Sequence, residues 1–557
     1  MTWKCGGLGP VGLLSLLILQ GLPYWCQPAL GQPVLDSAQR VDALFEGWVT
    51  HETPGCAVGV DRHGQSVLLK AYGLANLEHG APLTTRSVFR SASLAKQFTA
   101  MSILLLESEG KLSLEDDVRR FLPELQRYER PVRIRHLLSH TSGYRDYLTL
   151  FFYLAGARDD DYVSQEEVLD LLAHQKGLDF TPGDSYIYSN SNYLLLGAVV
   201  ERITGRTLRE FSQAKIFTPL GMKATRFQDD PNDLVPNRAV GYSPDGTSFR
   251  LNRTTLGLVG DGGLITTVED FLIWHRHLQA QGPEARRLLT TGSLGDGSAI
   301  GYAGGLIVHQ HRGLKRIWHL GFYAGFQGLY MSFPDEDVGL ILFCNRSDSD
   351  PEALAERISE IFLAERLQEP TLPAGLAEHE GAAFSGLYRD PRTGMMLRLR
   401  AEGQKLHLRL PERELSFLAR TGREFVSADG FYELLLQQEG RKRQVLFRPL
   451  WMPGKPFRVF TVADPPDLSA AELARYAGTY RCPEIFSEIH LDAVDGGLRY
   501  RHDYRHKYAP ESPLVPTGQD AFANDVLMVE GIRKRRRIVG LRLAARTVFG
   551  IECARTR

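Results

Sequence analysis

Apolar and polar positions follow two different periods in the first two thirds of the chain. Helical spacing begins after Asp36, a residue suited to a helix N-cap. Residues 56–73 alternate as two strands that turn at His63-Gly64, and three further strand segments lie within residues 303–345, before a helix opened by Asp350. A helix-rich stretch separates the two ends. The pattern predicts an α+β domain in which an antiparallel sheet, built from both ends and flanked by helices, leaves a cleft against the helical middle.

The C-terminal third has a different sequence pattern, in which short segments alternate between apolar and polar residues as is typical of β structure. This region repeats itself, because residues 384–408 align without gaps to residues 476–500 at an offset of 92 residues. Tyr388 in the first copy thus corresponds to Tyr480 in the second. The repeat predicts two related all-β modules, each a small barrel that closes its own edges.

The N-terminus reads as an export signal. Lys4 precedes an apolar stretch, Val11 to Leu19, and small residues stand before Gln32. The apolar stretch is much shorter than the roughly 20 residues that a membrane span needs. We therefore expect an exported protein, periplasmic or secreted, without a stable membrane span. The expected division is a signal peptide at 1–31, the α+β domain at 32–366, a linker at 367–380 and barrel modules at 381–464 and 465–557.

Charge and cysteine content narrow the classes of function. The 557 residues carry 65 basic and 66 acidic side chains, so the formal net charge is −1. A net charge this small gives no overall electrostatic attraction to nucleic acid or an anionic membrane. The basic run Arg533–Arg537 is interpreted as a solvated strand or turn, because no aromatic or Gly-rich segment accompanies it. Beyond the signal, the cysteines are too sparse for a disulfide scaffold or a zinc site, which favours buried, unpaired thiols.

Candidate chemistry begins at Ser93 and Lys96, which precede a strongly apolar helix pattern. The same Ser-x-x-Lys spacing recurs at Ser108–Lys111 and Ser212–Lys215, so the spacing alone decides nothing. Only the first copy stands at the start of a buried helix, where amides and the helix dipole favour a developing oxyanion. Ser93 is therefore the candidate nucleophile, with Lys96 on the same face.

A serine hydroxyl needs a base within hydrogen-bond reach. Tyr188 belongs to the only Tyr-x-Asn in the chain and lies in a turn-rich loop. Near a protonated Lys96 we expect the pKa of this phenol to be lowered. Which of the two groups is the principal base stays open, because coupled groups share their titration.

The third motif of the candidate site is His319-Leu320-Gly321, which lies on a predicted strand. Gly321 allows a substrate backbone to lie close to the strand. The amides of Ser93 and Phe322 are the candidate oxyanion hole. Asn190 and His319 are the candidate substrate-positioning side chains.

In this order the three motifs resemble those of the penicillin-recognising serine hydrolases, which comprise class C β-lactamases, DD-peptidases and their esterase and D-aminopeptidase relatives. Residues 135–147 and 260–274 also resemble stretches typical of this group. The resemblance covers roughly residues 36 to 365. With two barrels added, the chain is similar to the three-domain bacterial D-aminopeptidases, although no Gly/Pro-rich loop like the one that selects their substrates follows Asp520.

The resemblance implies a serine hydrolase that forms an acyl-enzyme on small amide or ester substrates. N-terminal D-residue peptides, including peptidoglycan-derived ones, are one option, and short-chain esters or β-lactams are others. A non-catalytic peptidoglycan-binding or sensor module is the alternative from another class. Cys56 and Cys344 fall on strands that are neighbours in the family's fold, so the resemblance also implies a disulfide in an exported protein.

No cofactor or metal is expected. His136 and His140 have helical spacing for one metal but lack the Glu of a His-Glu-x-x-His site. No phosphate-cradling loop or dinucleotide fingerprint occurs in the chain. Nothing in the sequence specifies an oligomeric state.

Overall fold

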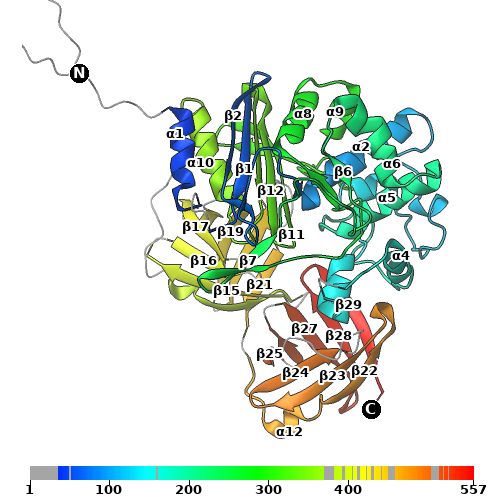
Figure 1. Cartoon of the computed structure of the whole chain (residues 1–557). Coiled ribbons are helices and arrows are strands. Elements are labelled where there is room, and N and C mark those ends of the chain that lie inside the picture. Colours follow the sequence, from blue (N-terminus) through cyan, green and yellow to red (C-terminus); the bar gives the residue numbers. More distant parts are fainter. Residues whose placement is uncertain are drawn as a thin grey trace, which may run out of the picture.

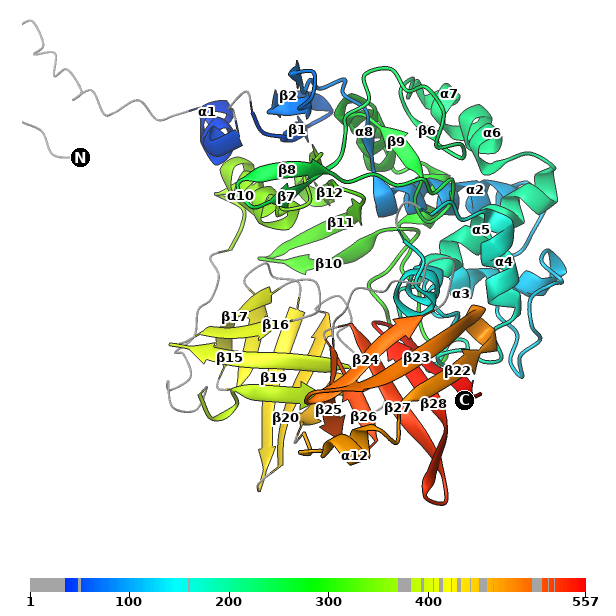
Figure 2. The same cartoon turned by 60° about the horizontal axis from the view of Figure 1, so that its bottom comes forward.

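The computed structural model describes residues 36–48, 52–158, 161–368 and, with short gaps, 382–556. The expected signal peptide and nearly all of the expected linker lie outside these residues. Figure 1 shows a mixed α/β body with two barrels beneath it, and Figure 2 shows the barrels side by side. Both barrels are closed, with eight strands each. The predicted α+β domain followed by two all-β barrels is confirmed.

The α+β domain is built on a six-stranded antiparallel sheet in the order β10-β11-β12-β13-β1-β2. Its strands are β1 (Cys56–Arg62), β2 (Gln65–Tyr72), β10 (Ile307–His311), β11 (Leu314–Tyr323), β12 (Phe326–Phe333) and β13 (Val338–Cys344). The first downstream segment forms two strands rather than one. His63 and Gly64 both have positive φ, as a two-residue hairpin turn between β1 and β2 requires. Both ends of the domain thus join in one sheet, as predicted.

Helices cover both faces of this sheet (Figure 1). On one face lie α1 (Ser37–Leu44), capped by the Asp36 carboxylate, and α10 (Pro351–Leu363), capped by Asp350. On the other lies α8 (Val268–Gln279), which approaches β1 and β13 closely. Glycines permit that approach, because a Cβ on Gly59 or Gly339 would collide with α8 side chains.

The inserted middle is mostly helical. Its helices are η2 (Ala92–Ala95), α2 (Lys96–Ser108), η3 (Val118–Arg120), α3 (Ile134–Leu138), the π-helix η4 (Thr149–Ala155), α4 (Gln165–Ala173), α5 (Asn190–Thr204), α6 (Leu208–Ser212), η5 (Gln213–Phe217), α7 (Thr218–Leu220) and α9 (Pro283–Leu288). Small sheets connect them: β3 (Leu74–Asn76) with β4 (Ala81–Pro82), β5 (Phe89–Arg90) with β9 (Leu264–Thr266) and β6 (Arg226–Phe227), and β7 (Tyr242–Asp245) with β8 (Ser248–Leu251). Helix α2 is buried along most of its length, which places its first residues deep in the domain.

The barrels follow in sequence. The first contains β14 (Gly386–Arg389), β15 (Met396–Glu402), β16 (Lys405–Arg409), β17 (Glu414–Thr421), β18 (Glu424–Ser427), β19 (Tyr432–Glu439), β20 (Lys442–Pro449) and β21 (Arg458–Val462). The second contains β22 (Gly478–Cys482), β23 (Ser487–Val494), β24 (Gly497–His502), β25 (Pro513–Gly518), β26 (Ala521–Ala523), β27 (Leu527–Lys534), β28 (Arg537–Ala545) and β29 (Val548–Arg555), with α12 (Ala470–Leu473) before it and η7 (Pro483–Ile485) after β22.

Both pairs of described cysteines are bonded. Cys56 and Cys344 stand opposite each other on β1 and β13 and form a disulfide. Cys482 and Cys553 form another between β22 and β29. The expectation of unpaired thiols was wrong, because strand register brings cysteines far apart in sequence to facing positions. Among the described helices, none combines the length and the hydropathy of a membrane span.

Candidate active site

Ser93 and Lys96 stand at the junction of η2 and α2. Ser93 is the one partly exposed residue in a buried run from Ser91 to Ala100, whereas Lys96 is fully buried. The Lys96 Nζ lies 3.1 Å from the Ser93 Oγ. Ala92, just before the serine, has a positive φ of 49° although it carries a Cβ. Such backbone strain persists where the surrounding structure enforces it, and here it presents the serine hydroxyl.

The two other Ser-x-x-Lys copies lack this environment. Lys111 and Lys215 are both partly exposed and pair with the same carboxylate, that of Glu109. Ser108 donates to a carbonyl of its own helix. Position at the start of a buried helix therefore separates the Ser93 copy from the other two, as the apolar pattern predicts.

Three groups hold the Lys96 amine. Besides the serine, Nζ donates to the Asn190 Oδ1 at 2.8 Å and to the Asp261 carbonyl at 2.7 Å. Burial lowers the pKa of Lys96 to about 8, although the nearby carboxylates of Asp261 and Asp146 raise it. An amine with this pKa is partly neutral near physiological pH and can then accept a proton from Ser93.

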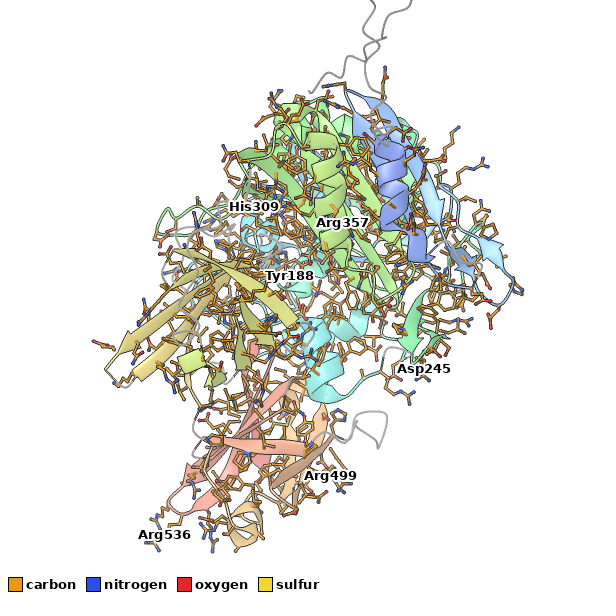
Figure 3. The ribbon with its side chains drawn as sticks, turned by 90° about the vertical axis from the view of Figure 1, so that its left-hand side faces the viewer. Tyr188, Asp245, His309, Arg357, Arg499 and Arg536 are labelled. Atoms are coloured by element: carbon orange, nitrogen blue, oxygen red, sulfur yellow. A yellow bond between two sulfur atoms is a disulfide. The ribbon has the colours of Figure 1, made fainter. Side chains whose placement is uncertain are left out.

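Tyr188 lies beside this amine, near the middle of the molecule (Figure 3). Lys96 Nζ is 5.0 Å from the centre of its ring. Burial raises the pKa of Tyr188 well above its usual value, and a hydrogen bond with Ser93 lowers it only in part. The expected lowering was wrong, because the ammonium lies over the ring face and cannot offset the cost of burying a phenolate.

Asn190 opens helix α5 and is fixed at both ends of its amide. Its Oδ1 accepts from Lys96, while its Nδ2 donates to the Asp146 Oδ2 at 2.9 Å. The Asn190 backbone N–H donates to the same Asp146 oxygen at 2.6 Å. The structure thus shows Asn190 holding the amine, and its expected contact with substrate stays a prediction.

His319 and Gly321 lie on β11. The His319 Nδ1 faces its neighbour's carbonyl at 2.7 Å, and Nε2 lies 3.2 Å from the Tyr302 hydroxyl. Burial lowers the pKa of His319 to about 3, helped by the Lys96 charge, so the ring is neutral. Both ring nitrogens are engaged inside the protein, and the expected role of His319 in positioning substrate also stays a prediction.

Gly321 brings β11 against Ser91 and Ala92, the residues just before Ser93. A Cβ on Gly321 would stand 2.1 Å from the Ser91 carbonyl oxygen, so only glycine fits here. Strand β10 pairs with β11 only as far as Trp318, which leaves the following residues without a β10 partner. The Phe322 amide therefore belongs to a strand segment beside Ser93, and the Phe322 side chain is 57% exposed.

Sequence reasoning missed two carboxylates and a histidine. Asp146 and Asp261 lie in segments that resemble family stretches, but no local spacing connects them to Lys96. Asp261 accepts from the Tyr147 hydroxyl at 3.0 Å, and burial raises its pKa. His140 accepts from the Ser189 N–H at 3.2 Å and its ring centroid lies 4.3 Å from that of Tyr188. These contacts join segments about 50 or more residues apart and depend on the fold.

No three His, Cys, Asp or Glu side chains of the described part of the chain lie close enough to hold a metal ion. The chemistry of the site rests on a partly exposed hydroxyl, a buried amine of lowered pKa and a phenol. A serine activated in this way carries out acyl transfer. The fold and the site together define a serine hydrolase.

Comparison with known proteins gives the family. Residues 40–364 match the family model described as Beta-lactamase, and the chain belongs to this family. A D-aminopeptidase of Cereibacter sphaeroides is 29% identical over 505 residues, which are 88% of this chain and 90% of the relative. Penicillin-binding protein 4* of Bacillus subtilis is 30% identical over 60% of this chain and 78% of its own length.

Solved structures share the fold. The octameric penicillin-binding protein homologue from Pyrococcus abyssi has a TM-score of 0.53 and 22% identity, and the match covers 76% of this chain and 99% of that one. The D-amino acid amidase from Ochrobactrum anthropi SV3 has a TM-score of 0.51 and 20% identity over 59% of this chain and 99% of its own.

Proposed function

We propose that this chain is a D-aminopeptidase-like hydrolase that cleaves small amides or short peptides through an acyl-enzyme at Ser93. The observation that carries the proposal is the 3.1 Å contact between the Ser93 Oγ and a buried amine whose pKa is about 8. The D-aminopeptidase relative supports the substrate class, because the similarity spans 88% of this chain and thus reaches into the barrels.

The reaction uses the groups of the site in sequence. Neutral Lys96 takes the hydroxyl proton as the Ser93 oxygen bonds to the substrate carbonyl carbon. The amides of Ser93 and Phe322 stabilise the oxyanion. The proton passes from the Lys96 ammonium to the leaving amine as the amide bond breaks, beside the Tyr188 hydroxyl that is hydrogen-bonded to Ser93. Water, activated by the same amine, then hydrolyses the acyl-enzyme and regenerates Ser93.

Covalent labelling tests the proposal. A fluorophosphonate probe should add to Ser93 in the full chain and fail to add to Ser93→Ala. The matched control is Ser108→Ala, which removes the serine of another Ser-x-x-Lys copy and should label normally. A chain that takes no label, or takes it at another residue, contradicts the proposal.

Substrate class is tested with chromogenic compounds. D-alanine anilide should be hydrolysed faster than L-alanine anilide, a butyrate ester and a chromogenic cephalosporin. Faster hydrolysis of the ester or the cephalosporin would be consistent with an acyl-enzyme mechanism but would contradict the proposed substrate class.

We also propose that the protein is exported and works in the periplasm or outside the cell. The two disulfides support this, because disulfides persist in oxidising compartments and are rare in the cytosol. Fractionation of cells that produce the full chain tests the proposal. Recovery of the uncleaved chain in the cytosol alone contradicts it.

A further inference from the structure

A turn of the second barrel reaches the segment that holds Asn190. This turn, η7, carries Glu484, whose side chain is 4% exposed. Arg145 Nη1 donates to the Glu484 Oε2 at 2.8 Å, and Arg145 is 6% exposed. The Lys176 N–H donates to the same Glu484 oxygen at 2.9 Å. A buried ion pair therefore joins the second barrel to the α+β domain 339 residues away in sequence.

Arg145 is also bound to the active site through its backbone. The Arg145 carbonyl accepts from the Ser191 Oγ at 2.6 Å, and that oxygen in turn accepts from the Tyr147 N–H at 2.9 Å. Asp146, between them, accepts from the Asn190 backbone and side chain. Residues 145–147 and the start of α5 thus form one hydrogen-bonded unit, and Asn190 is its contact with Lys96.

A second group of contacts fixes the other end of this unit. The Asp146 Oδ1 accepts from the Thr149 N–H, at the start of η4. At the far end of η4, the Tyr500 hydroxyl of the second barrel donates to the Leu154 carbonyl at 3.1 Å. Gly156 follows, and a Cβ there would collide with the imidazole of His502. The second barrel therefore holds residues on both sides of Asp146.

We propose that Glu484 is a positioning residue for the catalytic amine, acting through Arg145, Asp146 and Asn190. The second barrel is then a part of the active-site framework and not only an appended module. This inference rests on the proposed acyl-enzyme chemistry for its kinetic consequence. Its structural consequence, a loosened Asn190, can be measured without any activity.

The test compares three variants of the full chain. Glu484→Gln removes the charge with little change of shape. Glu488→Gln is the matched control, because it removes a carboxylate from the adjacent strand of the same barrel, and Glu488 is not among the hydrogen-bond and ion-pair partners described for Arg145. Tyr500→Phe removes only the hydroxyl that fixes η4 and serves if Glu484→Gln does not fold.

Hydrogen exchange of the peptide that contains Asn190 is the structural measurement. Its amide donates to Asp146, so Glu484→Gln should speed its exchange by about tenfold or more, since the opening of a packed segment governs exchange. Tyr500→Phe should give a smaller increase, and Glu488→Gln none. Equal exchange in Glu484→Gln and Glu488→Gln would overturn the inference, whether or not the protein labels at Ser93.

The kinetic measurement is the rate at which the fluorophosphonate phosphonylates Ser93, with loss of fluoride, as a function of pH. Several groups surround Lys96: the carboxyls of Asp146 and Asp261, the imidazoles of His140 and His319, and the phenols of Tyr188 and Tyr193. Glu484→Gln should lower the limiting rate by about tenfold or more, because small misplacements of catalytic groups are costly. Its ascending limb should move to lower pH, since Lys96 loses acceptors that stabilise its ammonium.

A merely structural role gives a different result. Partial unfolding lowers the fraction of molecules that label but leaves the rate and the ascending limb of the remaining molecules unchanged. That outcome overturns the positioning role. If the unsubstituted chain fails to label at Ser93 while Asn190 exchange still responds to Glu484→Gln, the proposed function fails and the positioning of Asn190 stands.

Discussion

The two barrels share one internal design but differ in how they meet the α+β domain. In each, a tyrosine of the first strand donates to the carbonyl four residues earlier, Tyr388 to Phe384 at 2.8 Å and Tyr480 to Tyr476 at 2.7 Å. The first barrel encloses a core of its own. Most buried apolar residues of the second barrel are continuous with the core of the α+β domain.

The turn after the first strand of each barrel differs between the two barrels. In the second barrel this turn holds Glu484, which pairs with Arg145. At the offset of 92 residues the first barrel has Arg392, which has the opposite charge and lies outside the described residues. Under the proposed positioning role, one copy of a repeated fold supports the active site, and the turn residue Glu484 is one of the features that distinguish it from the first barrel.

The largest expected effect is on stability, from Arg145→Ala. This change leaves the Glu484 carboxylate buried without its guanidinium, and such a loss costs about 3–5 kcal/mol of unfolding free energy. The first-barrel control is Arg448→Ala, which removes a partly exposed pair with Glu433 and should cost about 1 kcal/mol or less. Urea unfolding measures both changes. Equal losses would remove the distinction between the barrels.

The next effect concerns the disulfide that only the second barrel has. By the offset, Asp390 stands in the first barrel where Cys482 stands in the second. Cys482→Ala with Cys553→Ala should lower the unfolding free energy by about 2–4 kcal/mol, because the bond closes a loop of 71 residues. Denaturant unfolding without reductant measures this loss. A change below about 0.5 kcal/mol would show that the shared core alone holds this barrel.

The pH dependence of hydrolysis tests Lys96 as the base and should not depend on the first barrel. Because burial gives Lys96 a pKa of about 8, the amine is protonated and unable to accept a proton at lower pH. The kcat/KM for a butyrate ester, which has no amine of its own, should fall about tenfold for each pH unit below 8 and level off above it. Arg448→Ala should leave this limb in place. A flat profile from pH 6 to pH 9 would exclude Lys96 as the base.

Local features of the sequence predicted much of the fold and part of the site. Asp36 and Asp350 cap helices because capping is decided within a few residues. The Ser93–Lys96 pair was found because its spacing and the apolar helix after it are both local. Lys96 and Tyr188 were predicted together, but the degree of burial sets their pKa values, and no spacing reports burial.

Long-range pairing accounts for what the sequence did not predict. The Cys482–Cys553 disulfide depends on β22 lying beside β29 in a closed barrel. The ion pair between Arg145 and Glu484 depends on how the barrel docks on the domain. Glu484 follows Pro483 in an ordinary turn, and only docking buries it. The repeat itself was visible, because Tyr388 and Tyr480 keep the same place in both copies.

The smallest expected effect comes from that repeated tyrosine and tests the comparison most directly. Tyr388→Phe and Tyr480→Phe each remove one buried hydrogen bond of the same geometry, worth about 1 kcal/mol. The chemical change is identical, so any difference in outcome reflects how each barrel is coupled to the domain. For Tyr388→Phe, hydrogen exchange during urea unfolding should show a loss of stability in the first barrel alone.

Tyr480→Phe should also destabilise the α+β domain, because its core is continuous with that of the second barrel. Exchange in helix α5, which begins at Asn190, should speed up in this variant and stay unchanged in Tyr388→Phe. A loss confined to the second barrel would mean that the shared core does not couple the two bodies. Support of the active site would then depend on the direct contacts of Glu484 and Tyr500 with residues on either side of Asp146, and only variants of these two residues should affect Lys96.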